Sequence, residues 1–201
     1  MQYRGWAITG WNSVFLVLMS ALVLAVAGTG EEGVRMLIRA TARSSALLFL
    51  AAFLARPARQ LWRADATAFL LRNRRYLGVS MAVSHAIHGA AIVWLSTAFP
   101  GAYQADIVTL VGGGLGFAFI ALMAATSSDA AVSWLGRRRW QLLHRTGAWY
   151  VWGIFAFTFV PDPTVGWDAL HAAAVLAFVA APLVRASAWW KTRRRQRPAP
   201  A

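Results

Sequence analysis

Six apolar runs follow one another along this chain, and they constrain its fold more than any other feature. They lie roughly at residues 13–28, 44–55, 76–98, 107–126, 146–160 and 168–188. Because a helix needs about 20 mainly apolar residues to cross a bilayer, several of these runs are long enough on their own. The second run is short, but the charged segments alternate across a membrane only if it counts as a span. We therefore expect an all-α integral membrane protein, a six-transmembrane-helix bundle.

The composition supports a membrane location. Charged residues make up 13% of the chain and hydrophobic residues 59%, whereas about 25% of the residues of an ordinary soluble domain are charged. Too few charged side chains remain to cover a surface that faces water on all sides. The bundle is therefore expected to lie in a lipid bilayer.

The basic residues lie in alternate connections between the runs. The formal net charge is +13, and most of the Lys and Arg residues lie at 56–75, at 128–140 and after residue 190. The connections 97–106 and 160–169 contain no Lys or Arg. This distribution follows the positive-inside rule, so the N-terminus, the two basic loops and the C-terminus are expected in the cytoplasm. The alternation also argues against a nucleic-acid groove, which is another use of strongly basic chains.

Two features go against this topology. Arg35 and Arg39 lie in the first outer connection, where the rule expects few basic residues. The first run ends in "LAVAG" (24–28), which resembles the cleavage site of a signal peptide. Cleavage there would leave five spans and disturb the alternation of charge, so we expect the first span to be retained.

The chain contains no cysteine. This excludes covalent c-type haem attachment, iron–sulfur clusters held by thiolates, and disulfides. Paired carboxylates and a Ser–His–Asp set are missing as well, so no catalytic residue is expected. The residues that could hold a cofactor are the four histidines.

His85 and His88 lie within the third run, one helical turn apart. The spacing puts both on one face of a helix, and counting from Arg75 places them roughly 15 and 20 Å into the bilayer. Ligating side chains at such depth are costly and are candidates for function. Imidazole is an axial ligand of haem iron, and a helix bundle can house haem. The alternative is a structural role, with bonds across helices to backbone or to hydroxyls such as Ser80 or Ser84.

The other two histidines lie nearer the membrane surfaces. His144 is only about 7 Å into the bilayer when counted from Arg139, so a ligand and an interfacial histidine are equally good interpretations. His171 begins the sixth run on the outer side. That position is expected to be wet, which favours a structural role.

Four segments, in order, carry a resemblance to a known family. They are "TARSSALLFLAAFLARPARQLW" (41–62), "RRYLG" (74–78), "ATSSDAAVSWLG" (125–136) and "RWQLLH" (139–144). The series resembles the ferric-reductase-like transmembrane domain family, and within it the haem-binding membrane subunits of methionine sulfoxide reductase systems. The resemblance covers roughly residues 10 to 190 of the chain.

The resemblance implies a six-helix transmembrane domain over residues 1–190, followed by a basic, Pro-rich cytoplasmic tail at 191–201. It implies b-type haem between the third and fifth spans, one haem or two. In that family His88 matches the outer-side iron ligand of the third span, and His144 matches the inner-side histidine of the fifth span.

The same resemblance implies a set of contacts around the cofactors. Arg43, Arg74, Arg75 and Trp140 match family positions near the cofactors or the inner surface. They are therefore candidates to contact haem propionates or the phosphate of a flavin such as FMN.

One residue departs from the family pattern. The family usually has a second histidine in the fifth span, 13 residues after the first, where this chain has Phe157. His88 and His144 differ by roughly 12 Å in expected depth, whereas two ligands of one iron lie about 4 Å apart. Either His171 replaces the lost ligand, or His85 faces His144, or each iron is five-coordinate.

These expectations define the function. The resemblance implies a multi-pass protein of the bacterial inner membrane that passes electrons from quinol or reduced flavin to a partner redox protein. The rival hypothesis is a haem-free membrane scaffold that keeps the fold. A small-molecule permease is a third hypothesis, disfavoured because the spans lack acidic residues.

Overall fold

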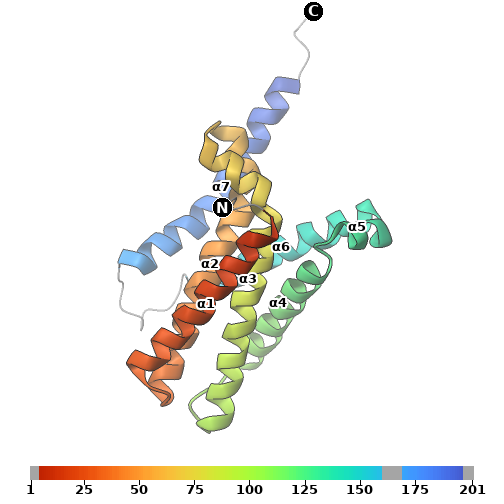
Figure 1. The fold of residues 1–201 in the computed structure, drawn as a ribbon. Helices are drawn as coiled ribbons and strands as arrows, with labels where there is room; N and C mark the ends of the chain where they lie inside the picture. Colours follow the sequence, from red (N-terminus) through yellow and green to blue (C-terminus); the bar gives the residue numbers. More distant parts are fainter. Residues whose placement is uncertain (1–4, 160–168, 197–201) are drawn as a thin grey trace, which may run out of the picture.

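The computed structural model of this chain describes residues 5–159 and 169–196 (Figure 1). All regular structure in this part is helical. The helices are α1 (Trp6–Ala27), α2 (Glu31–Leu61), α3 (Asp65–Ala98), α4 (Ile107–Ala125), α5 (Asp129–Leu135), α6 (Arg137–Phe159) and α7 (Ala169–Gln196). The prediction of an all-α protein is confirmed.

Five helices are long and apolar enough to cross a membrane. They are α1, α2, α3, α4 and the Ala172–Arg194 part of α7. The chain is therefore a multi-pass membrane protein. Helix α6 is not among them because its first turns are polar, beginning "RRRWQLLHRT", so the count of six spans stays a prediction.

Helices α2 and α3 extend well beyond the apolar runs at 44–55 and 76–98. A connection of only three residues, 28–30, joins α1 to α2, and only 62–64 separate α2 from α3. The two arginines expected in an outer loop, Arg35 and Arg39, are helical instead, and both form ion pairs along α2. Arg35 lies 2.8 Å from Glu31, and Arg39 pairs with Glu32. Each of the two arginines is thus paired with a carboxylate of the same helix.

Helices α2 and α3 pack along their length through small polar residues. Ser84 Oγ of α3 lies 2.9 Å from Ser45 Oγ and 2.8 Å from Ser44 Oγ. The Ser84 hydroxyl also donates to the Thr41 carbonyl at 3.2 Å. Small side chains allow helices in a membrane to approach closely, and their hydroxyls bond across the interface. Helix α1 packs on this pair, and α4 lies beside α3 (Figure 1).

Aromatic side chains fill the space between α2, α6 and α7. Phe49 stacks on Phe53 with ring centroids 5.1 Å apart, and Phe155 lies 5.5 Å from Phe49. Phe178 of α7 is fully buried and lies 5.6 Å from Phe155. This cluster fixes the face of α6 that points into the bundle.

Helix α7 contains a proline whose effect is compensated from another helix. Pro182 has no N–H, so the carbonyl of Phe178, four residues earlier, loses its helical partner. Trp152 of α6 donates its indole N–H to this carbonyl at 3.0 Å. The bond ties α6 to α7 and keeps a buried acceptor satisfied.

Candidate functional site

His88 is held by the backbone of α2. Its Nδ1 lies 3.1 Å from the Ile38 carbonyl and 3.3 Å from the Thr41 hydroxyl. The Thr41 hydroxyl also lies 2.7 Å from the Leu37 carbonyl, to which it donates. Since the carbonyl can only accept, this partner set assigns the proton to Nδ1 and leaves the lone pair on Nε2. An N–H donated to a backbone carbonyl is the usual arrangement of a histidine that binds metal through its other nitrogen.

His85 lies among aromatic rings, one turn before His88. Its ring centroid is 4.3 Å from Phe117, 5.1 Å from His88 and 5.8 Å from Phe155. Its Nδ1 is buried and has no hydrogen-bond partner within the described part of the chain. Buried polar atoms without a partner are uncommon. This nitrogen is therefore not held by a hydrogen bond in the described part of the chain.

The serines proposed as structural partners are used elsewhere. Ser80 accepts from Asn12 Nδ2 at 3.0 Å and donates to the Tyr76 carbonyl at 2.8 Å. Ser84 bonds to α2, as described above. The bonds across helices that a structural role predicts are present for His88, to the Ile38 carbonyl and the Thr41 hydroxyl, but not to Ser80 or Ser84. His85 Nδ1 makes no such bond to a described residue.

His144 is positioned by the end of α4. Its Nε2 lies 3.0 Å from the Thr126 hydroxyl, and its ring stacks on Trp140 with centroids 4.2 Å apart. The Trp140 indole N–H donates to the Thr126 carbonyl at 2.8 Å. The Thr126 hydroxyl also lies 2.7 Å from the Leu122 carbonyl, to which it donates. It therefore accepts from Nε2–H, and Nδ1 keeps the lone pair.

The histidines lie at two levels of the bundle. His144 and Phe155 are on one face of α6, together with the buried Gly147 and Val151. Phe155 contacts His85, and the 11 residues from His144 to Phe155 span roughly 16 Å of helix. The structure therefore brings His85 and His88 together but does not bring His144 to them. His171 is in the first turn of α7, and its side chain lies outside the described residues.

Phe157 does not face the histidines of α3. Its side chain is 64% exposed, on the outward face of α6, while Phe155 points inward and is 5% exposed. In this register the position opposite His85 is 155. A histidine at position 157 would therefore face away from the bundle interior.

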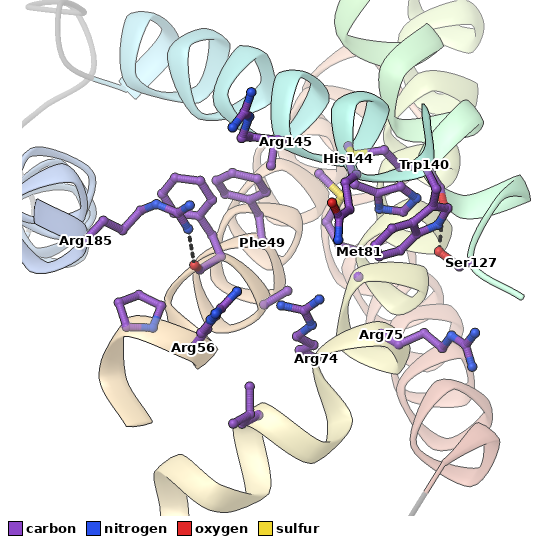
Figure 2. A pocket seen from close by; sticks show the side chains of 18 of the residues that line it. Phe49, Arg56, Arg74, Arg75, Met81, Ser127, Trp140, His144, Arg145 and Arg185 are labelled. Atoms are coloured by element: carbon purple, nitrogen blue, oxygen red, sulfur yellow. Dashed lines mark hydrogen bonds between the residues drawn. The ribbon is translucent and has the colours of Figure 1, made fainter. Parts of the chain in front are cut away.

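A large cavity lies at the end of the bundle that holds His144. Its volume is about 1230 Å³, and its lining comes from α2, α3, α4, α6 and α7 (Figure 2). Seven arginines line it: Arg56, Arg72, Arg74, Arg75, Arg138, Arg145 and Arg185. No described lining residue is a carboxylate. His144 and Trp140 also face this space, so four of the residues predicted from the sequence, His144, Trp140, Arg74 and Arg75, come together here.

Arg75 carries a counter-charge on its outer side. Its guanidinium lies 2.6 Å from the Asp129 carboxylate in α5. Through this hydrogen bond and its charge, Arg75 holds the pKa of the exposed Asp129 below the usual value of an aspartate. The pair fixes α5 to the start of α3.

Arg185 is tied to the α2 backbone where Pro57 interrupts it. Pro57 has no N–H and leaves the Phe53 carbonyl without a helical partner. Arg185 of α7 donates to that carbonyl at 2.9 Å, and its guanidinium lies 4.2 Å from the Phe53 ring centroid. This contact puts a cation at the wall of the cavity.

Arg43 lies away from the inner cavity. It is on α2 two residues after Thr41, which bonds His88. Arg43 therefore belongs to the His88 level and not to the level of Arg74 and Arg75.

Some residues of the site gave no signal in the sequence. Thr126 and Ile38 are ordinary residues whose roles depend on how α4 packs on α6 and α2 on α3. Arg185 does stand out in the sequence, as a charged residue near the end of the apolar run 168–188.

A helical, multi-pass bundle with imidazoles at two levels and a basic cavity defines a class of membrane proteins whose interior can hold a redox cofactor. The chain is similar to the protein-methionine-sulfoxide reductase heme-binding subunit MsrQ of Ralstonia nicotianae. The two are 30% identical over 185 residues, which cover 87% of this chain and 82% of that protein. This chain belongs to the MsrQ family, as the ordered motifs predicted. No family model matches the chain, and no solved structure does.

Proposed function

We propose that this chain is the haem-binding subunit of a membrane redox system and passes electrons across the bacterial inner membrane to a partner reductase. The relative's name supports haem binding and a sulfoxide reductase as the partner. The observation that carries the proposal is the arrangement of His88. Its Nδ1–H donates to the Ile38 carbonyl, which leaves Nε2 as the iron-binding nitrogen.

The residue types around His88 suit haem b, provided that the Phe117 ring, which stacks on His88 at 6.3 Å, moves aside. His85 supplies a second buried nitrogen without a partner among the described residues. Phe117 and Phe155 offer flat apolar faces beside it. When bound, haem supplies one-electron redox chemistry. The chain's own residues orient the ligand, exclude water and set the polarity around the iron.

The topology completes the proposal. With α6 as the sixth span, both termini are cytoplasmic, and the arginine-lined cavity lies at the inner side of the membrane, in line with the positive-inside rule. The transmembrane domain is 1–190. The basic tail from 191 begins within α7, which continues to Gln196, so the tail extends this helix into the cytoplasm.

His144 is proposed as the iron ligand of an inner level, separate from that of His88. Along α6, His144 lies roughly 16 Å from Phe155, the residue that contacts His85. This separation favours one cofactor at each level over a shared iron. Arg74, Arg75 and Trp140 line the same cavity and are candidates for contacts to haem propionates. FMN as an occupant rests on the charge of the cavity alone. Quinol or a reduced flavin is the proposed electron donor.

Visible spectroscopy tests the proposal directly. The protein purified in mild detergent should show a Soret band and, after reduction with dithionite, a sharp α band. A pyridine haemochrome assay then gives the number of haems per chain, and a value near two would support separate levels. A protein that stays colourless after expression with added haem would contradict haem binding. It would favour the scaffold hypothesis, for which the rings already packed on His85 are the supporting observation.

A further inference from the structure

Three arginines from three helices meet in one part of the inner cavity. Arg56 of α2 and Arg185 of α7 lie on the side opposite His144, and Arg74 of α3 lies between them and His144 (Figure 2). Unlike Arg75, none of the three forms an ion pair with a described carboxylate. The side of the cavity away from His144 therefore holds a cluster of cations, Arg56, Arg74 and Arg185, with no internal anion.

This cluster is electrostatically unbalanced. Arg56 repels both Arg74 and Arg185, and Arg74 also repels Arg185. Like charges held close together in a site partly shielded from water are unfavourable unless an anion lies among them. Arginine side chains match the oxygens of phosphate with paired hydrogen bonds. The cluster is therefore suited to a phosphate group.

The position of the cluster relative to the membrane indicates where that phosphate comes from. Trp189 of α7 lines the same cavity and, with Trp190, is exposed. Arg193 and Arg194 lie over these two rings, at 4.3 and 5.3 Å from the centroids. Tryptophans flanked by basic residues mark the headgroup level of a membrane. The cluster is therefore at the depth of lipid phosphates.

The rest of the lining suits an amphiphile. Phe49, Phe53 and Met81 form an apolar wall behind the cations. A phospholipid has the matching pattern, with an anionic group at one end and apolar chains at the other. Basic pockets between transmembrane helices on the cytoplasmic side bind anionic lipid headgroups.

We propose that Arg56, Arg74 and Arg185 form a binding site for an anionic phospholipid of the inner leaflet, such as phosphatidylglycerol. The proposal requires the membrane setting but not haem, and it assigns Arg74 to the lipid, which leaves Arg75 and Trp140 as the candidates for contacts to haem propionates. Its occupant joins α2, α3 and α7 at their cytoplasmic ends. Lipid binding therefore stabilises the arrangement of these three helices.

Arg56→Gln is the most direct test. No hydrogen bond joins Arg56 to a described residue, so this substitution leaves the bonds of the fold in place. The purified protein is titrated with phosphatidylglycerol or phosphatidylcholine in detergent micelles, and the unfolding midpoint is followed. Native mass spectrometry of the same samples detects retained lipid. Phosphatidylglycerol should stabilise the unaltered protein selectively, and Arg56→Gln should weaken its binding about tenfold, the loss expected for one charged hydrogen bond. Arg139→Gln, at an exposed residue outside the cavity, removes the same charge and should change nothing.

Three results would overturn the proposal. The first is equal stabilisation by the two lipids. The second is stabilisation by inorganic phosphate that matches phosphatidylglycerol, which would assign the site to a soluble anion. The third is a loss of haem in Arg56→Gln with lipid retention unchanged, which would assign the cluster to haem propionates. Haem content is measured separately by pyridine haemochrome, so failure of lipid binding leaves the haem proposal standing, and the reverse is also true.

Discussion

Arg185 Nη1 lies 2.9 Å from the carbonyl oxygen of Phe53, which is the carbonyl that Pro57 leaves without a helical partner. Arg185 of α7 thus supplies the hydrogen-bond donor that the Phe53 carbonyl lacks within α2. Trp152 does the same for the Phe178 carbonyl opposite Pro182. Both prolines lie inside their helices, and without these two bonds the Phe53 and Phe178 carbonyls would have no partner in the bundle interior. The two bonds link α2 to α7 and α7 to α6, which are three of the helices that line the inner cavity.

Arg185→Met should destabilise the protein by about 1–3 kcal/mol, the cost of leaving a buried acceptor without a partner. In a Pro57→Ala background the new N–H can bond to the Phe53 carbonyl, so the same substitution should cost less. Thermal or denaturant unfolding of the four proteins in a zwitterionic detergent without anionic lipid gives the coupling free energy. Additive effects in this cycle would show that Arg185 acts by some other contact.

Gly33, at the start of α2, lies so close to the end of α1 that a larger residue there should destabilise the protein. A Cβ at Gly33 would lie 1.9 Å from the Gly28 carbonyl oxygen, an overlap with backbone that no side-chain movement relieves. Gly33→Ala should therefore lower the free energy of unfolding by about 1–3 kcal/mol, the usual cost of overpacking. Gly30→Ala is the matched control, because its Cβ meets nothing within 4 Å. Equal stability of the two variants would contradict the close approach of the two helices.

The sequence predicted the centres of the helices better than their ends. The apolar run at 107–126 matches α4 (Ile107–Ala125) because Asp106 begins that helix with a side-chain cap and polar residues follow it. Helix α2 extends beyond its apolar run at 44–55 to Glu31–Leu61. Hydropathy reports only the lipid-facing part of a helix, whereas ion pairs such as Glu31–Arg35 continue the helix beyond it.

The sequence predicted only the part of the site that depends on a single helix. Histidines in apolar segments are visible in the sequence, and His85 and His88 are neighbours on one helix. The cavity is not visible, because Arg56 and Arg185 meet only when α2 packs on α7. The outward direction of Phe157 could not be predicted by counting residues along the helix. It depends on which face of α6 the aromatic cluster buries.

The Arg75–Asp129 pair predicts a dependence on pH. The pKa of Asp129 is lower in the folded protein than in the unfolded chain, through its hydrogen bond to Arg75. The pair therefore stabilises the fold above the pKa of an unfolded aspartate, about 3.9, and this contribution is lost as the pH falls through the lower folded value. Asp129→Asn should be slightly less stable than the unaltered protein at about pH 7, and the difference should shrink at about pH 3. A difference in unfolding midpoint that does not change with pH would contradict the role of the charge.

His88→Ala is the substitution that bears most directly on function. His88 is the histidine whose Nδ1–H is fixed by a backbone carbonyl, so its removal deletes a preformed ligand. Even residues that only orient a metal ligand cost about 10–100-fold in affinity when they are removed. The ratio of haem to protein, from pyridine haemochrome, should therefore fall about tenfold or more. Ser96→Ala, on an exposed part of α3, is the control and should keep the haem.

The other histidines extend this test to the arrangement of the cofactors. If the two levels hold separate haems, His144→Ala should lower the haem content of the protein that retains His88 by about half, because one of two sites is lost. His171→Ala then tests whether His171 is the second ligand of the outer iron, and His85→Ala tests whether His85 pairs with His144, since loss of a second ligand changes a six-coordinate spectrum to a five-coordinate one. Unchanged haem content in His88→Ala would contradict the assignment of His88 as an iron ligand, whatever the other variants do.

A complete loss of haem in both His88→Ala and His144→Ala, with the helical content unchanged by circular dichroism, would instead support one iron shared between α3 and α6. Such a site would require these helices to shift relative to each other, because His144 lies roughly 16 Å along α6 from Phe155, the residue that contacts His85.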